Sequence, residues 1–121
     1  MIGFFEDIAY WDEYRGGVLE EEHGEALAAA MGDRSVLFLA SHGVIAAGRS
    51  TAQAFERLYY LERACQFQVL AQSGGHALRH VDKAVLEAPE RRADREAWSH
   101  ADRHLAAWLR ILDREEPDYF D

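Results

Sequence analysis

The sequence predicts one α/β domain in which short strands come first and two long helices come last. Two short apolar runs, Val36–Ala40 and Val44–Ala47, are rich in β-branched residues and have the length of buried strands. A stretch that begins near Ser50 and another that covers about 90–114 repeat apolar residues at the spacing of an amphipathic helix. A chain of 121 residues is long enough for one modest core and too short for two, so we expect a single domain over 1–121.

The first third of the chain is expected to hold extended chain and then a helix. Residues 2–14 alternate loosely between apolar and polar side chains, which indicates extended chain, with two short strands and a break at Glu6-Asp7 as one arrangement. The three glutamates at 20–22 then place negative charge at the start of a helix, where the helix dipole favours it. Gly32 predicts the end of this helix, because glycine is common just after the last helical residue.

Two more helices are expected in the second half of the chain. Ser50 and Gln53 have the spacing of a capping box, and Gly74 predicts the end of the helix that they begin. The last helix is expected to start near Pro89 and to end before Pro117. The apolar stripes of the two helices are predicted to be buried: Ala54, Leu58, Leu61, Cys65 and Val69 in the first, and Trp98, Ala101, Leu105, Trp108 and Leu112 in the second.

Composition restricts the classes of partner. The formal net charge is −9, from 13 basic and 22 acidic residues, which argues against binding nucleic acid or an anionic membrane surface. No apolar run approaches the roughly 20 residues of a membrane span, and the N-terminus does not have the pattern of a signal peptide. The single cysteine excludes an internal disulfide and fits the reducing cytoplasm. We therefore expect a cytoplasmic protein whose partner is a small-molecule substrate, a metal ion or another protein.

His42 is the main candidate for chemistry, because it lies between the two predicted strands. Gly43 gives the backbone room to turn there, and loops at the ends of strands are common places for functional side chains. A neutral imidazole is a good ligand for zinc or a similar divalent cation, but such a site needs two or three further ligands. The alternative is a turn histidine that only hydrogen-bonds a nearby carbonyl.

The remaining candidates give weaker signals. His100 and His104 are four residues apart and could chelate a metal from one side of a helix, but the glutamate of the protease-type motif is absent between them, which favours a solvated pair. His76 and His80 follow a glycine pair in an expected loop. Cys65 lies on the apolar stripe and is expected to be a packed thiol rather than a nucleophile.

The segment VLFLASHGVIAAGRSTAQAFERLYYLERACQFQVLAQ and the closing DREEPDY resemble the C-terminal half of the class II aldolase/adducin family. In that family, one strand ends in an asparagine-histidine-glycine corner. The next strand ends in glycine and leads into a helix with a similar LERA segment. The resemblance spans Phe4 to Asp121. It implies that the chain is part of an α/β/α layered fold around a largely antiparallel sheet, and that it assembles into rings, often tetramers.

The resemblance also implies a metal site. Enzymes of the family bind a divalent metal through three histidines: two come from an H-x-H motif in the N-terminal half, and one comes from the corner that His42 matches. Zinc is the expected metal and manganese is the alternative. The metal acts as a Lewis acid on a ketose phosphate or related substrate in aldol cleavage, epimerisation or decarboxylation. In the aldolases, a glutamate from the N-terminal half is the acid/base, so His42 is the one site residue that the resemblance assigns here.

The sequence departs from the family pattern in three ways. No H-x-H occurs in it, Ser41 stands in place of the asparagine, and Trp11 stands where many relatives carry histidine. One hypothesis is a metal-dependent carbon–carbon lyase to which this chain supplies one ligand, together with a missing N-terminal half or with copies of itself. The other is a non-catalytic, adducin-like assembly module that has lost the site. The missing ligands favour the second hypothesis, and the retained His42 favours the first.

Overall fold

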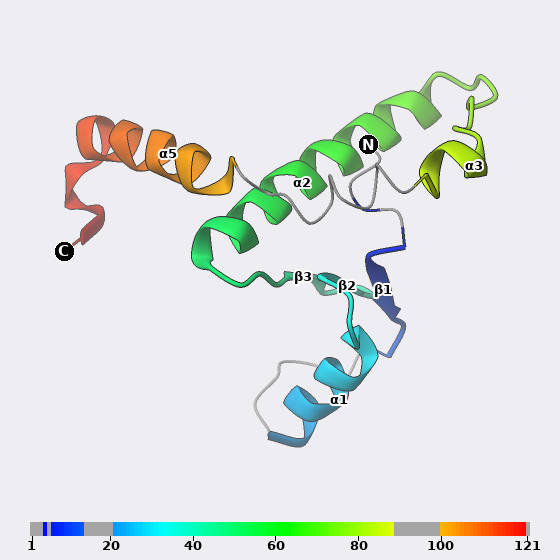
Figure 1. Ribbon diagram of the computed structural model, residues 1–121, viewed down its shortest axis with the longest axis horizontal. Coiled ribbons are helices and arrows are strands. Elements are labelled where there is room, and N and C mark those ends of the chain that lie inside the picture. The colour runs from blue at the N-terminus through cyan, green and yellow to red at the C-terminus, as the bar shows by residue number, and fades with distance from the viewer. Residues whose placement is uncertain (1–3, 5, 14–20, 89–99, 121) are drawn as a thin grey trace. The chain divides into compact units, whose positions relative to one another are not determined.

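The computed structural model describes residues 4, 6–13, 21–88 and 100–120. Short strands precede the long helices along the chain, so the predicted α/β class is confirmed (Figure 1). The chain divides into two compact units, Met1–Ala47 and Gly48–Asp121. Each unit is described by itself, and the single domain expected over 1–121 stays a prediction.

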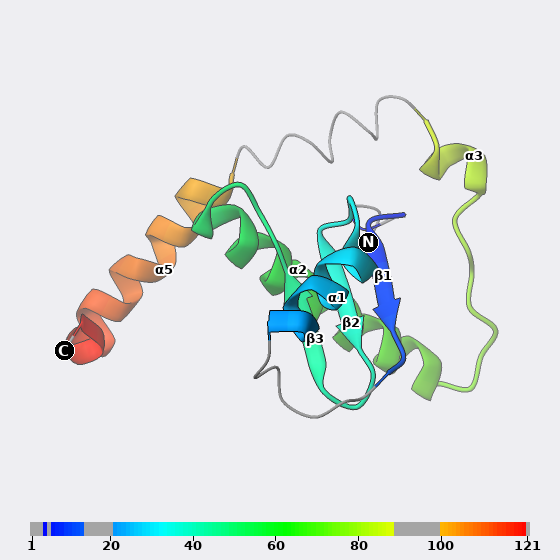
Figure 2. The same ribbon diagram turned by 90° about the horizontal axis from the view of Figure 1, so that it is seen from below.

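The first unit is a small sheet covered by one helix. Strand β1 (Ile8–Trp11) pairs in parallel with β2 (Val36–Leu39), and β2 pairs antiparallel with β3 (Gly43–Ala46), as Figure 2 shows. Helix α1 (Glu21–Met31) connects β1 to β2 and packs against both. A parallel pair needs such a crossover, whereas the antiparallel pair needs only a tight turn. The sheet is therefore mixed, and the expected strands at 36–40 and 44–47 are confirmed.

Local chemistry explains where these elements begin and end. Glu6 has a φ of 60°, which breaks the extended chain just before β1. The carboxylate of Asp7 accepts a hydrogen bond from the backbone N–H of Ser35 (2.8 Å), which fixes the entries of β1 and β2 together. Gly32 has a φ of 55° and ends α1 as predicted, because glycine adopts this conformation at little cost. The centre of the sheet is fully buried at Val36 and Leu37.

The second unit consists of helices. They are α2 (Thr51–Ser73), the short α3 (Lys83–Leu86), α5 (Ala101–Glu115) and the 3₁₀ turn η1 (Pro117–Phe120). The predicted cap at Ser50 is confirmed: its hydroxyl accepts from the N–H of Gln53 (3.3 Å). The Gln53 side chain reaches back one residue further than in a capping box and accepts from the N–H of Arg49 (3.1 Å). Helices α2 and α5 pack against each other.

Gly48 allows the chain to approach the start of α2 closely. A Cβ atom at this position would lie 2.6 Å from the backbone nitrogen of Ala54 and 2.8 Å from the Cβ of Gln53. Atoms cannot approach so closely without displacing the helix. The glycine after β3 is therefore required by packing.

The predicted apolar stripe of α2 is only partly buried. Leu61 is buried, but Leu58 and Val69 are exposed, so the prediction is wrong at these two positions. The reason is that α5 packs beside another part of the helix surface, which carries Glu56 and Tyr59. Helix α3 was not predicted, and Pro89 and Trp98 of the predicted last helix lie outside the described residues. None of the helices in the described residues is both long enough and apolar enough to cross a membrane.

The chain's last described turn folds back on α5. The hydroxyl of Tyr119 in η1 donates a hydrogen bond to a carboxylate oxygen of Asp113 (2.9 Å). Desolvation, this hydrogen bond and the negative charge of Asp113 together raise the pKa of Tyr119, because each disfavours the phenolate. The tail is thus held by a neutral tyrosine.

Candidate functional site

His42 lies in the turn between β2 and β3, as the sequence predicted. The turn comprises Ala40–His42, and the backbone N–H of His42 donates to the carbonyl of Leu39 (3.1 Å). The N–H of Ala40 donates to the carbonyl of Trp11 on β1 (2.9 Å), so two strands hold the turn in place. His42 itself is exposed. The structure thus presents an imidazole on a fixed backbone, while its role as a metal ligand stays a prediction.

Ser41 adopts a left-handed backbone conformation, with a φ of 56°. Most residues with a Cβ are strained there, and asparagine tolerates the conformation best after glycine. This geometry gives a physical reason for the asparagine that the family carries before its histidine. The serine at this position keeps the turn but without the side chain best suited to it.

The described residues do not form a complete metal site. Within these residues there is no group of three or more His, Cys, Asp and Glu side chains that could hold a cation. Trp11 ends the neighbouring strand β1, pairs with Leu39 and donates its indole N–H to the carbonyl of Glu13. An indole has no lone pair to offer a metal. The indole of Trp11 is therefore not a second ligand beside His42.

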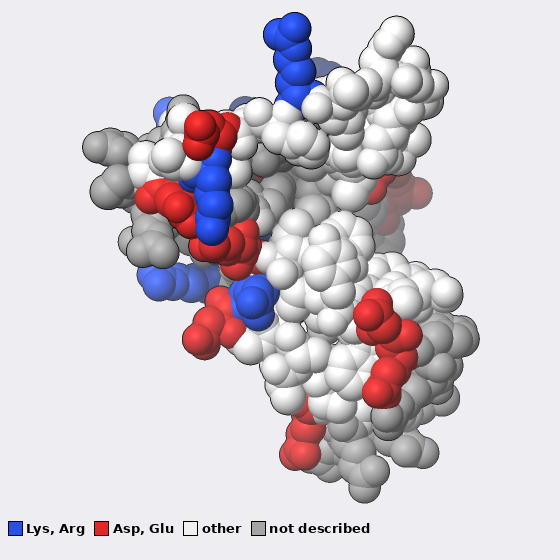
Figure 3. Space-filling view, turned by 90° about the vertical axis from the view of Figure 1, so that its right-hand side faces the viewer, with Lys and Arg blue, Asp and Glu red and all other residues white. Residues whose placement is uncertain are grey.

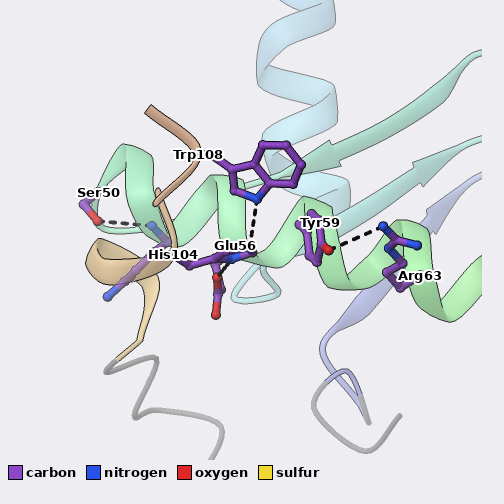
Figure 4. A network of polar contacts seen from close by, with 7 residues as sticks. Ser50, Glu56, Tyr59, Arg63, His104 and Trp108 are labelled. Atoms are coloured by element: carbon purple, nitrogen blue, oxygen red, sulfur yellow. Dashed lines mark hydrogen bonds and ion pairs between the residues drawn. The ribbon is translucent and has the colours of Figure 1, made fainter. Parts of the chain in front are cut away.

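A second cluster of functional side chains lies between α2 and α5 (Figure 4). Glu56 on α2 is buried, with 4% of its surface exposed, and its carboxylate contacts Nδ1 of His104 on α5. The indole N–H of Trp108 donates to Nε2 of the same imidazole (3.0 Å). The ring of Tyr59 meets the imidazole edge to face, with 4.6 Å between centroids, and Phe55 lies 5.4 Å away. His104 thus bridges a buried carboxylate and an indole within an aromatic cage.

The predicted solvated pair at His100 and His104 is wrong for His104. His100 is exposed and contacts Arg103, but His104 is packed against α2. The sequence could show that His104 and Trp108 share a helix face, because they are four residues apart. It could not show that Glu56 contacts His104, because the two residues are 48 positions apart along the chain. Only the packing of the two helices brings the carboxylate to the imidazole.

The remaining candidate residues are His76, His80 and Cys65. His76 and His80 are exposed in the segment between α2 and α3, as predicted. Cys65 is a free, half-buried thiol on α2. On the face drawn in Figure 3, carboxylates lie beside basic groups among the described residues.

The comparisons with known proteins agree with one another. Residues 1–69 match the family described as Class II Aldolase and Adducin N-terminal domain. A putative aldolase class 2 protein of Caulobacter vibrioides is 36% identical over 122 residues, which cover 94% of this chain and 44% of that protein. Gamma-adducin of Rattus norvegicus is 39% identical over 69 residues, which cover 56% of this chain and 10% of that protein.

A solved structure is similar over nearly the whole chain. The crystal structure of an aldolase II superfamily protein from Pseudomonas syringae superposes with a TM-score of 0.77 at 35% sequence identity. The match covers 99% of this chain and 48% of the other chain. The chain therefore spans less than half the length of each of these three similar proteins.

Proposed function

The chain belongs to the class II aldolase and adducin family, and on that premise we propose that it supplies one metal ligand, His42, to a metal-dependent carbon–carbon lyase. The further ligands and the acid/base come, in this proposal, from an N-terminal half of the family type or from another copy of the chain. The substrate is a small carbonyl compound or sugar phosphate, cleaved, epimerised or decarboxylated. A bound divalent cation, zinc or manganese, would supply Lewis-acid stabilisation of negative charge on substrate oxygen.

One observation supports this proposal most directly: an exposed imidazole on a turn that two strands fix. The carbonyl of Leu39 accepts from the N–H of His42 itself, and the carbonyl of Trp11 accepts from the N–H of Ala40, two residues earlier. A ligand on a fixed backbone loses little conformational entropy when it binds a metal, which makes the position suitable for one corner of a shared site. A cytoplasmic location is part of the proposal, and the single free cysteine supports it.

The test measures metal content with and without a partner polypeptide. The full chain is loaded with zinc or manganese alone, and again after mixing with a polypeptide that carries the family's H-x-H segment. We expect bound metal in the mixture and its loss in His42→Ala, because removing one of three ligands weakens a metal site severely. His80→Ala is the matched control, since His80 is also exposed but lies in the other unit. A His42→Ala mixture that binds as much metal as the wild-type mixture would contradict the proposal.

The second candidate function is a non-catalytic assembly module like that of the adducins. Two observations favour it: the lack of a three-ligand group among the described residues, and the large exposed apolar side chains of Phe67 and Leu70 on α2. If the mixture of the two polypeptides forms a complex but takes up no metal, this candidate replaces the lyase.

A further inference from the structure

We propose that Glu56, His104 and Trp108 form a proton-operated latch on α5, anchored to α2 by Glu56, in which neutral His104 holds the indole of Trp108 and protonated His104 releases it. All three side chains belong to the second unit. The inference is independent of the lyase proposal, since neither His42 nor a metal enters it.

The donors and acceptors of the latch allow one arrangement of protons. The indole nitrogen of Trp108 carries a hydrogen and can only donate, so Nε2 of His104 must accept. The imidazole is then neutral, with its one proton on Nδ1, where the ionised carboxylate of Glu56 accepts it. Glu56 is almost fully buried and needs this partner, because a buried carboxylate without one is strongly destabilising.

A second proton on His104 changes one bond and keeps the other. The proton comes from solvent and binds the lone pair of Nε2, which Trp108 had used. Two N–H groups then face each other, and the hydrogen bond from Trp108 is lost. The bond to Glu56 becomes an ion pair between a carboxylate and an imidazolium, which is stronger than the neutral contact. Acidification therefore frees the indole while α5 stays attached to α2.

The groups around His104 leave the second proton a path to Nε2. The side chain of His104 is 22% exposed, and Trp108 is 37% exposed, so water reaches the bond between them. From α2, the titratable groups in contact with the ring are Glu56, Tyr59 and Tyr60, and the guanidinium of Arg63 lies over the ring of Tyr59. From α5, His100, one turn before His104, contacts Arg103. In η1, Tyr119 binds Asp113.

The latch is tested by NMR of the full chain between pH ~8 and pH ~5, the range in which histidine side chains generally change charge. The indole ¹⁵N–¹H signal of Trp108 is assigned by its loss in Trp108→Phe. We compare the exchange rate of this signal with that of a free indole at the same pH, because intrinsic exchange slows on acidification, and we expect the protection of Trp108 to be larger at the upper pH than at the lower pH. The ¹⁵N shifts of His104 should report the Nδ1–H form at the upper pH. This measurement needs no variant at His104.

A pair of matched variants separates the latch from general histidine titration. His104→Asn keeps an N–H donor near the position of Nδ1 for Glu56, but it places no acceptor at the position of Nε2 and cannot gain a proton. We expect its indole to show low protection, relative to a free indole at the same pH, at both pH values. His100→Asn, one turn earlier on α5, should behave as the wild-type chain. The proposal is overturned if the protection of the wild-type indole does not change with pH, if His104 carries its proton on Nε2 at pH ~8, or if His104→Asn keeps the wild-type pH response.

Discussion

At the scale of single residues, the backbone of the His42 turn is more informative than the histidine itself. Ser41 has a φ of 56°, where residues with a Cβ pay a conformational cost that glycine and asparagine largely avoid. The following residue is the proposed ligand, so the strain lies next to the position where a fixed imidazole is needed. The side chain at position 41 therefore affects how firmly the backbone of His42 is held in place.

We predict that Ser41→Asn stabilises the chain by about 0.5 kcal/mol, because asparagine fits the left-handed conformation better than serine does. The measurement is the free energy of unfolding from urea titration followed by circular dichroism. Ser41→Ala is the matched variant. Alanine is strained at this φ, so this variant should not be stabilised. Equal stability of the Asn and Ala variants would show that the turn does not impose the conformation.

At the scale of elements, the sequence specified most starts and ends because they depend on local chemistry. Gly32 ends α1, and Ser50 with Gln53 begins α2. The site was less predictable. His42 falls in a turn that its flanking strands define, whereas the contact between Glu56 and His104 depends on how two helices pack. A 23-residue helix also offers several faces, and sequence periodicity did not show which one α5 would cover.

We predict opposite effects of the same substitution at two glycines. Gly48→Ala should destabilise the chain by about 1–3 kcal/mol, because the new Cβ would meet the backbone of Ala54 at 2.6 Å. Gly24→Ala should stabilise it by up to about 1 kcal/mol, because Gly24 is exposed within α1 and a Cβ there meets nothing within 4 Å. Urea unfolding of both variants and the wild-type chain provides the comparison. If Gly48→Ala leaves the stability unchanged or raises it, the close approach at Gly48 is not a constraint in solution.

At the scale of the whole molecule, the chain leaves large apolar side chains uncovered. Phe67, Val69 and Leu70 on the second half of α2 each have about two-thirds of their surface exposed (64%, 65% and 66%). Phe67 and Leu70 are three residues apart and share a helix face. Exposed apolar side chains on one face usually mark a place where another polypeptide binds. Both hypotheses about function require such a partner: the lyase needs further ligands, and the assembly module needs copies to assemble.

We therefore predict that the isolated chain self-associates and that Phe67→Glu combined with Leu70→Lys weakens the association. Each apolar side chain that is no longer buried at an interface loses about 1.5–3 kcal/mol, so the dissociation constant should rise by at least roughly tenfold. Sedimentation velocity over a range of concentrations measures the change. Gln68→Glu is the control, because Gln68 is an exposed polar residue of the same helix segment and the substitution adds a charge without removing apolar surface. A wild-type chain that is folded and monomeric at every concentration would show that this surface of α2 needs no partner.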